Sequence, residues 1–173
     1  MPHEKIIEHL GAETRFFEEK DLSTLHKENI AIPTELAELL SHFKGAIIFT
    51  RGAKFKTQSK IPVRDKERYI DLDIIYGLNP DSNNIFLKNK TYGNQIDNDF
   101  YIFGESGGGD QFCISKRTEK IYYWYHEATS DDCSLFYIAP SFIEFIENLV
   151  PDDENAKIDF DEDDGVISAH FDF

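Results

Sequence analysis

The spacing of apolar residues predicts a helix over residues 33–44. One face of this segment carries apolar side chains at positions i, i+3, i+4 and i+7, which are Leu36, Leu39, Leu40 and Phe43. Pro33 is suited to the first turn of a helix, and Gly45 is suited to the position just after its last turn. The segment therefore has signals for both ends of the helix.

The same spacing predicts a second helix towards the end of the chain, with apolar positions Phe142, Phe145, Ile146 and Leu149. Ser141 followed three residues later by Glu144 is the sequence signature of a capping box, and Pro151 is expected to end this helix. A further helix near the N-terminus is indicated by Ile6, Ile7, Leu10 and Phe17, with an interruption at Gly11. The predicted helices thus lie on either side of a central region.

In the central region the apolar pattern changes to a period of two residues, which is typical of strands. Residues 69–76 alternate in this way, and shorter strand-like segments follow the same rule at residues 46–49, 100–103, 111–115 and 121–126. Residues 116–120 predict a turn, and residues 77–99 predict a long polar connection because they are rich in Asn, Asp, Gly and Pro. We therefore predict an α+β fold, in which an antiparallel β-meander sheet is flanked by N-terminal helices and one C-terminal helix.

Three consecutive glycines, Gly107, Gly108 and Gly109, separate two of the predicted strands. Such a run indicates backbone with positive φ or a close approach, at a structural corner or at a site. Residues 104–108 also match G-x-S-x-G, the motif in which Ser106 would be the nucleophile of a serine hydrolase. That motif needs a helix after the turn, whereas residues 111–115 alternate like a strand. A meander corner is the favoured interpretation, and a serine hydrolase is the remote alternative.

The chain has 173 residues and a formal net charge of −15. This charge argues against direct binding of nucleic acid, which relies on clustered Lys and Arg, and favours a basic partner. We divide the chain into one domain, residues 1–151, and an acidic C-terminal tail, residues 152–173. The tail carries nine acidic residues against one lysine, so it holds −8 of the charge. It is either a solubilising segment or a means of capturing a basic partner.

Cofactors, metals and membranes are not indicated by the sequence. The two cysteines match no zinc spacing, and we expect no metal and no cofactor. The longest apolar run, residues 135–139, is far too short to span a membrane. The first residues lack the layout of a signal peptide, so we expect a cytoplasmic protein with no membrane partner.

The order of these features resembles the SUKH superfamily, which contains a fungal Smi/Knr-type regulator of cell-wall synthesis and many bacterial immunity proteins. The resemblance begins with Ile32-Pro33 before a Leu-rich helix ending in Lys44-Gly45, and continues with residues 102–104 and 108–110. It ends with residues 121–126, which include Trp124, and residues 138–145, which include Ser141. Together these motifs span about residues 28–150. The long connection and the acidic tail lie outside the shared pattern.

The resemblance implies a SUKH-like fold and a binding domain without catalytic residues. It further implies an immunity protein that neutralises a cognate bacterial toxin by stoichiometric protein–protein contact, and the charge favours a basic toxin such as a nuclease. The alternative is a scaffold or regulatory interaction module, like the cell-wall regulator. For the contact surface we predict acidic and aromatic residues around the sheet and its glycine corner: Asp71, Asp73, Glu105, Asp110, Tyr123 and Tyr125.

Overall fold

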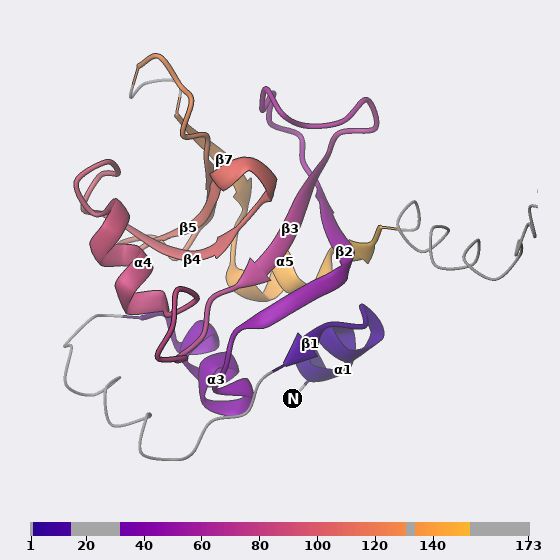
Figure 1. Ribbon diagram of the computed structural model, residues 1–173. Coiled ribbons are helices and arrows are strands. Elements are labelled where there is room, and N and C mark those ends of the chain that lie inside the picture. The colour runs from indigo at the N-terminus through magenta and orange to yellow at the C-terminus, as the bar shows by residue number, and fades with distance from the viewer. Residues whose placement is uncertain (1, 15–31, 131–133, 153–173) are drawn as a thin grey trace, which may run out of the picture.

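A computed structural model describes residues 2–14, 32–130 and 134–152, and its centre is one antiparallel sheet (Figure 1). The strands are β1 (Glu13–Thr14), β2 (Ile47–Lys56), β3 (Tyr69–Ile75), β4 (Phe100–Glu105), β5 (Gln111–Ser115), β6 (Ile121–Trp124), β7 (Leu135–Ala139) and β8 (Leu149–Pro151). Strands β1 to β7 lie in the sheet in chain order, and β8 pairs with β2. The predicted antiparallel meander is confirmed. Phe17 and the tail beyond Asp152 lie outside the described residues.

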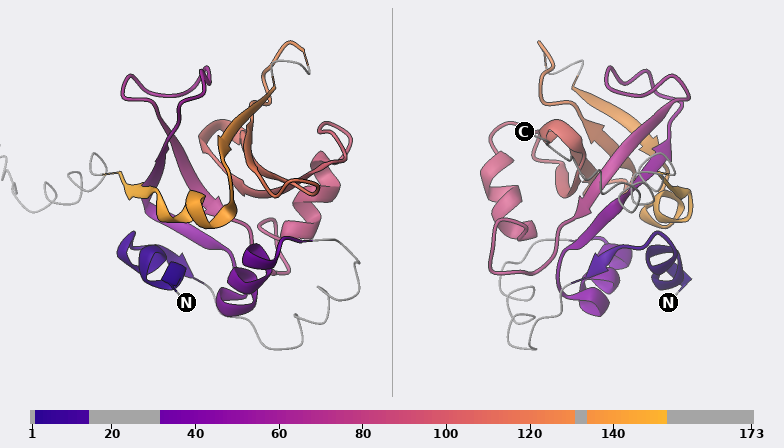
Figure 2. Two further views of the ribbon diagram at one scale, coloured as in Figure 1. Left: turned by 180° about the vertical axis from the view of Figure 1, so that it is seen from behind. Right: turned by 45° about the vertical axis from the view of Figure 1, so that its right-hand side comes forward.

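The described residues include four α-helices around this sheet: α1 (Pro2–His9), α3 (Thr34–Phe43), α4 (Ile85–Tyr92) and α5 (Phe142–Glu147). Helices α1 and α3 lie close to α5, and the right panel of Figure 2 shows α4 and α5 on opposite sides of the sheet. Tyr92 at the end of α4 packs against Trp124 on β6, with ring centroids 5.7 Å apart. The α+β prediction, with helices from both ends of the chain, is confirmed.

The core between α5 and the sheet is built mainly from aromatic rings. The Phe145 ring centroid lies 5.2 Å from that of Phe55 on β2 and 5.2 Å from that of Phe112 on β5. Phe103 on β4 lies within 5.6 Å of the same ring. Tilted and edge-to-face pairs at these separations are favourable beyond the area that they bury. Helix α5 is short, but its apolar face anchors three strands at once.

Helix α5 begins as the sequence predicts and ends earlier. The Ser141 hydroxyl accepts a hydrogen bond from the Glu144 backbone amide at 3.2 Å, which confirms the predicted N-cap. The helix stops at Glu147, however, and Leu149 begins strand β8 instead of extending the helical face. Leu149 opposes Phe55 across the β2–β8 pair. The pairing of backbone groups with β2 thus outweighs the helical spacing of the apolar side chains.

The segment predicted as a long polar connection contains helix α4. Its sequence shows no clear apolar stripe, because the helix buries a single residue, Ile85. What starts this helix is a local hydrogen bond pattern: the Asn84 side chain accepts from the backbone amides of Phe86 and Leu87, both at 3.0 Å. The cap was visible in the sequence only as an asparagine in a polar stretch, and for that reason the helix was missed.

The end of α3 differs from prediction in one residue. Lys44, not Gly45, has positive φ, with φ 60° and ψ −52°, and the Gly45 amide donates to the Phe43 carbonyl at 2.6 Å. This is a γ-turn centred on a residue with a side chain, a conformation that is rare and strained. The turn also requires glycine at position 77, because a Cβ on Gly77 would lie 2.1 Å from the backbone of Gly45.

Replacing Lys44 with glycine is therefore expected to stabilise the fold by about 1 kcal/mol, since glycine adopts positive φ without the steric cost. Chemical denaturation of the two proteins measures the gain. Lys44→Ala is the control, because alanine keeps the Cβ and should give no comparable gain. If alanine stabilised the protein as much as glycine, the strain would not reside in the backbone.

Candidate functional site

The glycine run forms the corner that joins β4 to β5. Residues Gly107–Gly109 make a single 3-10 turn, with φ values of +84° at Gly108 and +97° at Gly109. The turn is closed at its base because the Ser106 amide donates to the Asp110 carbonyl at 2.9 Å. Of the part of the chain that the structure describes, no atom beyond the neighbouring residues lies within 4 Å of the position that a Cβ on Gly108 would occupy. Glycine is required here for its backbone conformation, as the corner interpretation predicts.

Ser106 at this corner does not have the setting of a hydrolase nucleophile. It is 5% exposed, and the element that follows it is the glycine turn and then strand β5, not a helix. An acid and a histidine follow Ser106 in an order acceptable for a triad, as Asp131, Asp132 and His170, but all three lie outside the described residues. The strand–turn–helix geometry on which the motif depends is replaced by a strand–turn–strand corner.

Asp110, the last residue of the corner, is buried and fully engaged. Its carboxylate accepts hydrogen bonds from the Tyr123 hydroxyl at 2.8 Å and from the His126 backbone amide at 3.0 Å. It also lies 2.6 Å from Nδ1 of His126. Asp110 therefore ties the corner to the end of β6 through several hydrogen bonds.

Two residues of the predicted contact surface are thus inside the molecule. Asp110 is 2% exposed, and Tyr123 is 0% exposed, with its ring 5.1 Å from that of Phe112. Neither offers area to a partner, which corrects the sequence-based expectation for both. Strand alternation alone did not show that Tyr123 faces the side of the sheet that α5 covers. Tyr125 is partly exposed, and its hydroxyl donates to Glu127 at 3.1 Å.

The remaining predicted acids lie together. Asp71 and Asp73 are exposed on β3, and Gly107 of the corner lies beside Asp73, whose Oδ2 is 3.6 Å from the place of a Cβ. The pKa of Asp73 is raised by partial burial and by the negative charges of Asp71 and Glu105. We call Asp71, Asp73 and Glu105 the acidic surface. Mutual repulsion within it means that a cationic partner would relieve an electrostatic cost.

The first residue of the acidic tail, Asp152, lies close to the acidic surface. Asp71 opposes Lys54 across the β2–β3 pair, and Lys54 lies 3.4 Å from the Asp152 carboxylate. Burial and then the charge of Asp152 raise the pKa of Asp71, with a smaller contribution from Asp65, and Lys54 lowers it. Asp152, the first residue of the tail, therefore lies next to the acidic surface, a proximity that no local sequence pattern indicates.

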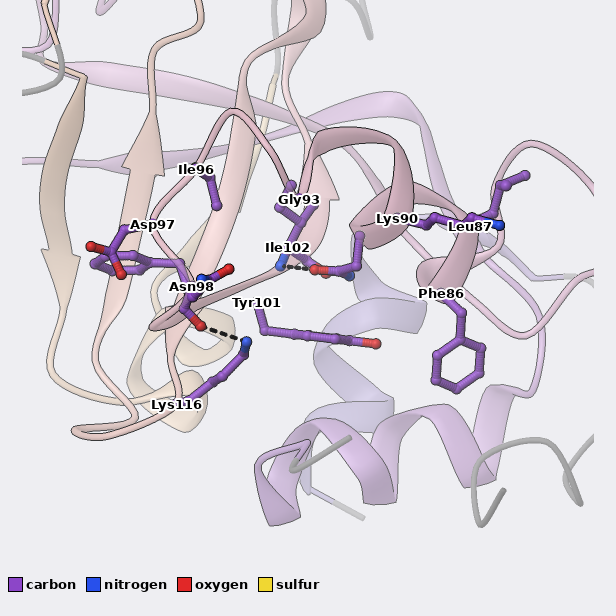
Figure 3. A pocket seen from close by; sticks show the side chains of 12 residues that line it. Phe86, Leu87, Lys90, Gly93, Ile96, Asp97, Asn98, Tyr101, Ile102 and Lys116 are labelled. Carbon is purple, nitrogen blue, oxygen red and sulfur yellow. Dashed lines mark hydrogen bonds between the residues drawn. The ribbon is translucent and has the colours of Figure 1, made fainter. Parts of the chain in front are cut away.

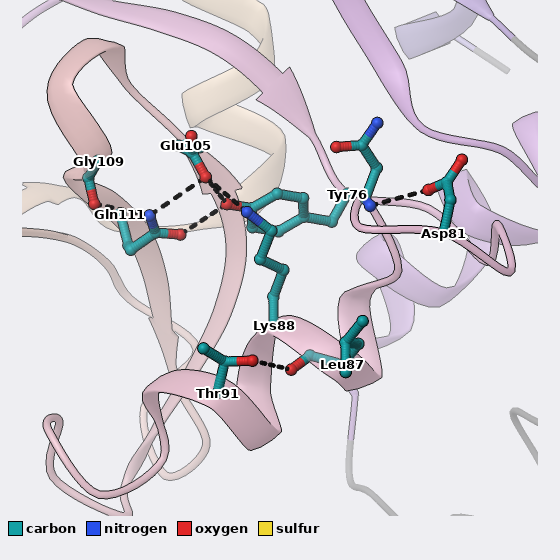
Figure 4. Close-up of polar contacts among 9 residues, drawn as sticks. Tyr76, Asp81, Leu87, Lys88, Thr91, Glu105, Gly109 and Gln111 are labelled. Carbon is teal, nitrogen blue, oxygen red and sulfur yellow. Dashed lines mark hydrogen bonds and ion pairs between the residues drawn. The ribbon is translucent and has the colours of Figure 1, made fainter.

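Glu105 differs from the two aspartates because polar side chains hold it (Figure 4). Its Oε2 accepts hydrogen bonds from the Tyr76 hydroxyl and from Lys88 Nζ, the latter at 2.9 Å. Burial alone would raise the pKa of Glu105, but these two donors outweigh it and hold the pKa below its ordinary value. The Tyr76 hydroxyl also bonds to the Gln111 side chain at 2.8 Å. Lys88 belongs to the unpredicted helix α4, so the sequence did not reveal this network.

Replacing Glu105 with glutamine is expected to lower the free energy of unfolding at pH 7 by about 1 kcal/mol, because charge-assisted hydrogen bonds are lost. The folded pKa of Glu105 is lowered from 4.5, so its stabilisation is complete above pH 4.5 and fades as the pH falls through the folded pKa. Denaturation curves from pH 7 to pH 3 should show wild type and variant converging.

Asp73→Asn is the matched control, and its expected effect on the free energy of unfolding has the opposite sign. The folded pKa of Asp73 is raised, so the ionised group costs stability at pH 7, and the amide should be slightly more stable there, by no more than about 0.5 kcal/mol. A Glu105→Gln deficit that stayed constant across this pH range would contradict the assigned role of the charge.

Among the described residues, no helix is long and apolar enough to cross a membrane. The antiparallel sheet and its flanking helices make this an α+β protein whose fold is consistent with the SUKH type. Residues 19–148 match the model of the SMI1 / KNR4 family (SUKH-1). The chain therefore belongs to this family, which is generally a family of non-enzymatic immunity or regulatory proteins.

One curated relative is the SPbeta prophage-derived uncharacterized protein YokK of Bacillus subtilis (strain 168). It is 35% identical over 101 residues, which cover 58% of this chain. The match covers 51% of the relative, so the chain spans about half the length of the protein that it resembles. The family assignment supports a toxin-immunity or SMI1-like protein.

Proposed function

We propose that this protein is an immunity protein that binds and neutralises a cognate toxin by stoichiometric contact. The observation that carries the proposal is the acidic surface, in which partial burial and then nearby negative charges raise the pKa values of Asp71 and Asp73. The carboxylates repel one another in the free protein. A basic surface of the toxin would offset this repulsion, and this gain would favour binding.

The chemistry of the acidic surface fits a nuclease as the toxin. Nucleases bind phosphates through clustered cations, and a row of carboxylates on a strand can occupy the same cations. Asp71 and Asp73 stand two positions apart on β3, so they project from the same side of the strand. Glu105, at the end of β4, extends the row towards the corner, and the partly exposed Tyr125 is proposed as an aromatic contact beyond it. A net charge of −15 would steer the encounter.

The alternative is a scaffold or regulatory module that binds a cellular protein, and family membership is compatible with it. The partner distinguishes the two proposals. In the test, the tagged full chain is mixed with the product of the neighbouring gene, and toxin activity is titrated against it. We expect inhibition that is complete at a one-to-one ratio. Recovery of an endogenous enzyme or signalling protein, with no inhibition of a toxin, would favour the regulatory role.

A further inference from the structure

A hollow of about 520 Å³ lies between α4 and β4, and none of the three residues of the acidic surface lines it (Figure 3). Besides the Lys88–Glu105 ion pair, α4 is held against β4 by Asn89. The Asn89 side chain donates to the Ile102 carbonyl and accepts from the Ile102 amide, both at 2.8 Å. These two bonds occupy the backbone of β4 where β3 no longer pairs with it. Beyond this clamp the helix and the strand diverge, and the hollow is preformed.

The walls of the hollow are largely apolar and incompletely covered. Phe86, Ile96 and Phe100 line it and are partly buried, and the Tyr101 ring forms its floor. Leu87 at its edge is 48% exposed, one of the most exposed large apolar side chains of the described residues. A volume of this size, with aromatic walls, lies in the range of small-molecule sites.

The polar groups of the hollow favour an anion. Lys90 and Lys116 line it, and Asp97 is the acid among its lining residues. Asp97 is already engaged, since one carboxylate oxygen accepts from the Asp99 amide at 2.8 Å. Lys116 donates to the Asn98 carbonyl at 2.6 Å, which leaves further N–H groups of its ammonium available. Within the described residues, Lys90 forms no ion pair or side-chain hydrogen bond.

We propose that this hollow binds a small organic anion with an aromatic body. The ring system would pack between Phe86, Phe100 and Tyr101, and its carboxylate or sulfonate would face Lys90 and Lys116. An excess of lysine at a cavity is unusual in a chain of net charge −15, and it is opposite in sign to the acidic surface. The site is independent of the proposed function, because the basic toxin and the anion require surfaces of opposite charge.

The probe for this site is 8-anilinonaphthalene-1-sulfonate, an aromatic anion that fluoresces on leaving water. Titration of the full chain should give saturable one-to-one binding. Leu87→Asp should weaken it at least about tenfold, because an aspartate places a charge against the apolar wall and repels the sulfonate. Val63→Asp is the matched control, since Val63 is 50% exposed in the loop between β2 and β3. It should leave binding unchanged.

A second pair of measurements isolates the charge. Lys90→Gln should weaken binding of the sulfonate about threefold to tenfold, and should not change binding of neutral N-phenyl-1-naphthylamine. Lys66→Gln, an exposed lysine in the β2–β3 loop, is the control for net charge. Absence of saturable binding, or equal effects of Leu87→Asp and Val63→Asp, would overturn the proposal. If the chain dimerised at higher concentration and thereby released the dye, the hollow would be the binding site of a second copy of the chain. That result would also overturn the proposal.

Discussion

Changing Asp71 and Asp73 together to lysine is expected to weaken binding of the cognate toxin by about 30-fold or more, mainly through a slower association rate. The two side chains lie on the same side of β3, and their charges already repel each other and Glu105. A basic partner that gains from these carboxylates would meet two cations in the variant. The association rate of the variant should also depend less on salt concentration than that of the wild type, because the attraction that salt screens is reduced.

The free variant is not expected to lose stability, and this separates a binding effect from a folding effect. The raised pKa values of Asp71 and Asp73 mean that their ionised forms are unfavourable in the folded protein at pH 7. Thermal unfolding and association kinetics on the same samples measure both quantities. Binding that fell only in proportion to the folded fraction would contradict the assignment of the acidic surface as the contact.

The control variant changes net charge equally at a different place. Glu38 on α3 and Glu147 on α5 are exposed, so replacing both with lysine makes the same change in total charge. This variant should retain most of the association rate, because surface charges separated by more than a Debye length from the contact are screened. Equal losses in the two double variants would show that net charge, and not the acidic surface, governs the encounter.

The second large effect is expected at Asp110, and it is an effect on folding. Asp110→Asn should lower the free energy of unfolding by about 2 kcal/mol, because a buried acceptor of several hydrogen bonds is lost. Toxin binding by the folded fraction should be unchanged, since Asp110 is 2% exposed. Urea denaturation and calorimetric titration below the transition measure the two quantities.

Tyr123→Phe provides the graded comparison for Asp110→Asn. It removes one of the donors to the same carboxylate and keeps the aromatic ring against Phe112, so a loss of about 1 kcal/mol is expected. If Asp110→Asn weakened toxin binding while leaving stability intact, the corner carboxylate would be a contact, as the sequence first suggested, and not an internal tie.

The sequence was sufficient to predict those elements whose structure depends on a few neighbouring residues. The leucine spacing of α3, the Ser141 cap of α5 and the glycine corner were predictable because each depends on bonds within one turn. Helix α4 and strand β8 were not, since the first depends on the Asn84 cap and the second on pairing with β2. Lys88 and the contacts of Glu105 were missed with α4.

Net charge, the meander and the family resemblance follow from the linear pattern, because composition and periodicity are properties of the chain itself. Whether a carboxylate is a contact or an internal tie is not such a property. Asp73 and Asp110 were equal candidates in the sequence, and folding placed the first on an exposed strand and the second under Tyr123 and His126. Burial and hydrogen bonding come from residues distant in sequence, so these roles are established by the packing of β4, β5 and β6.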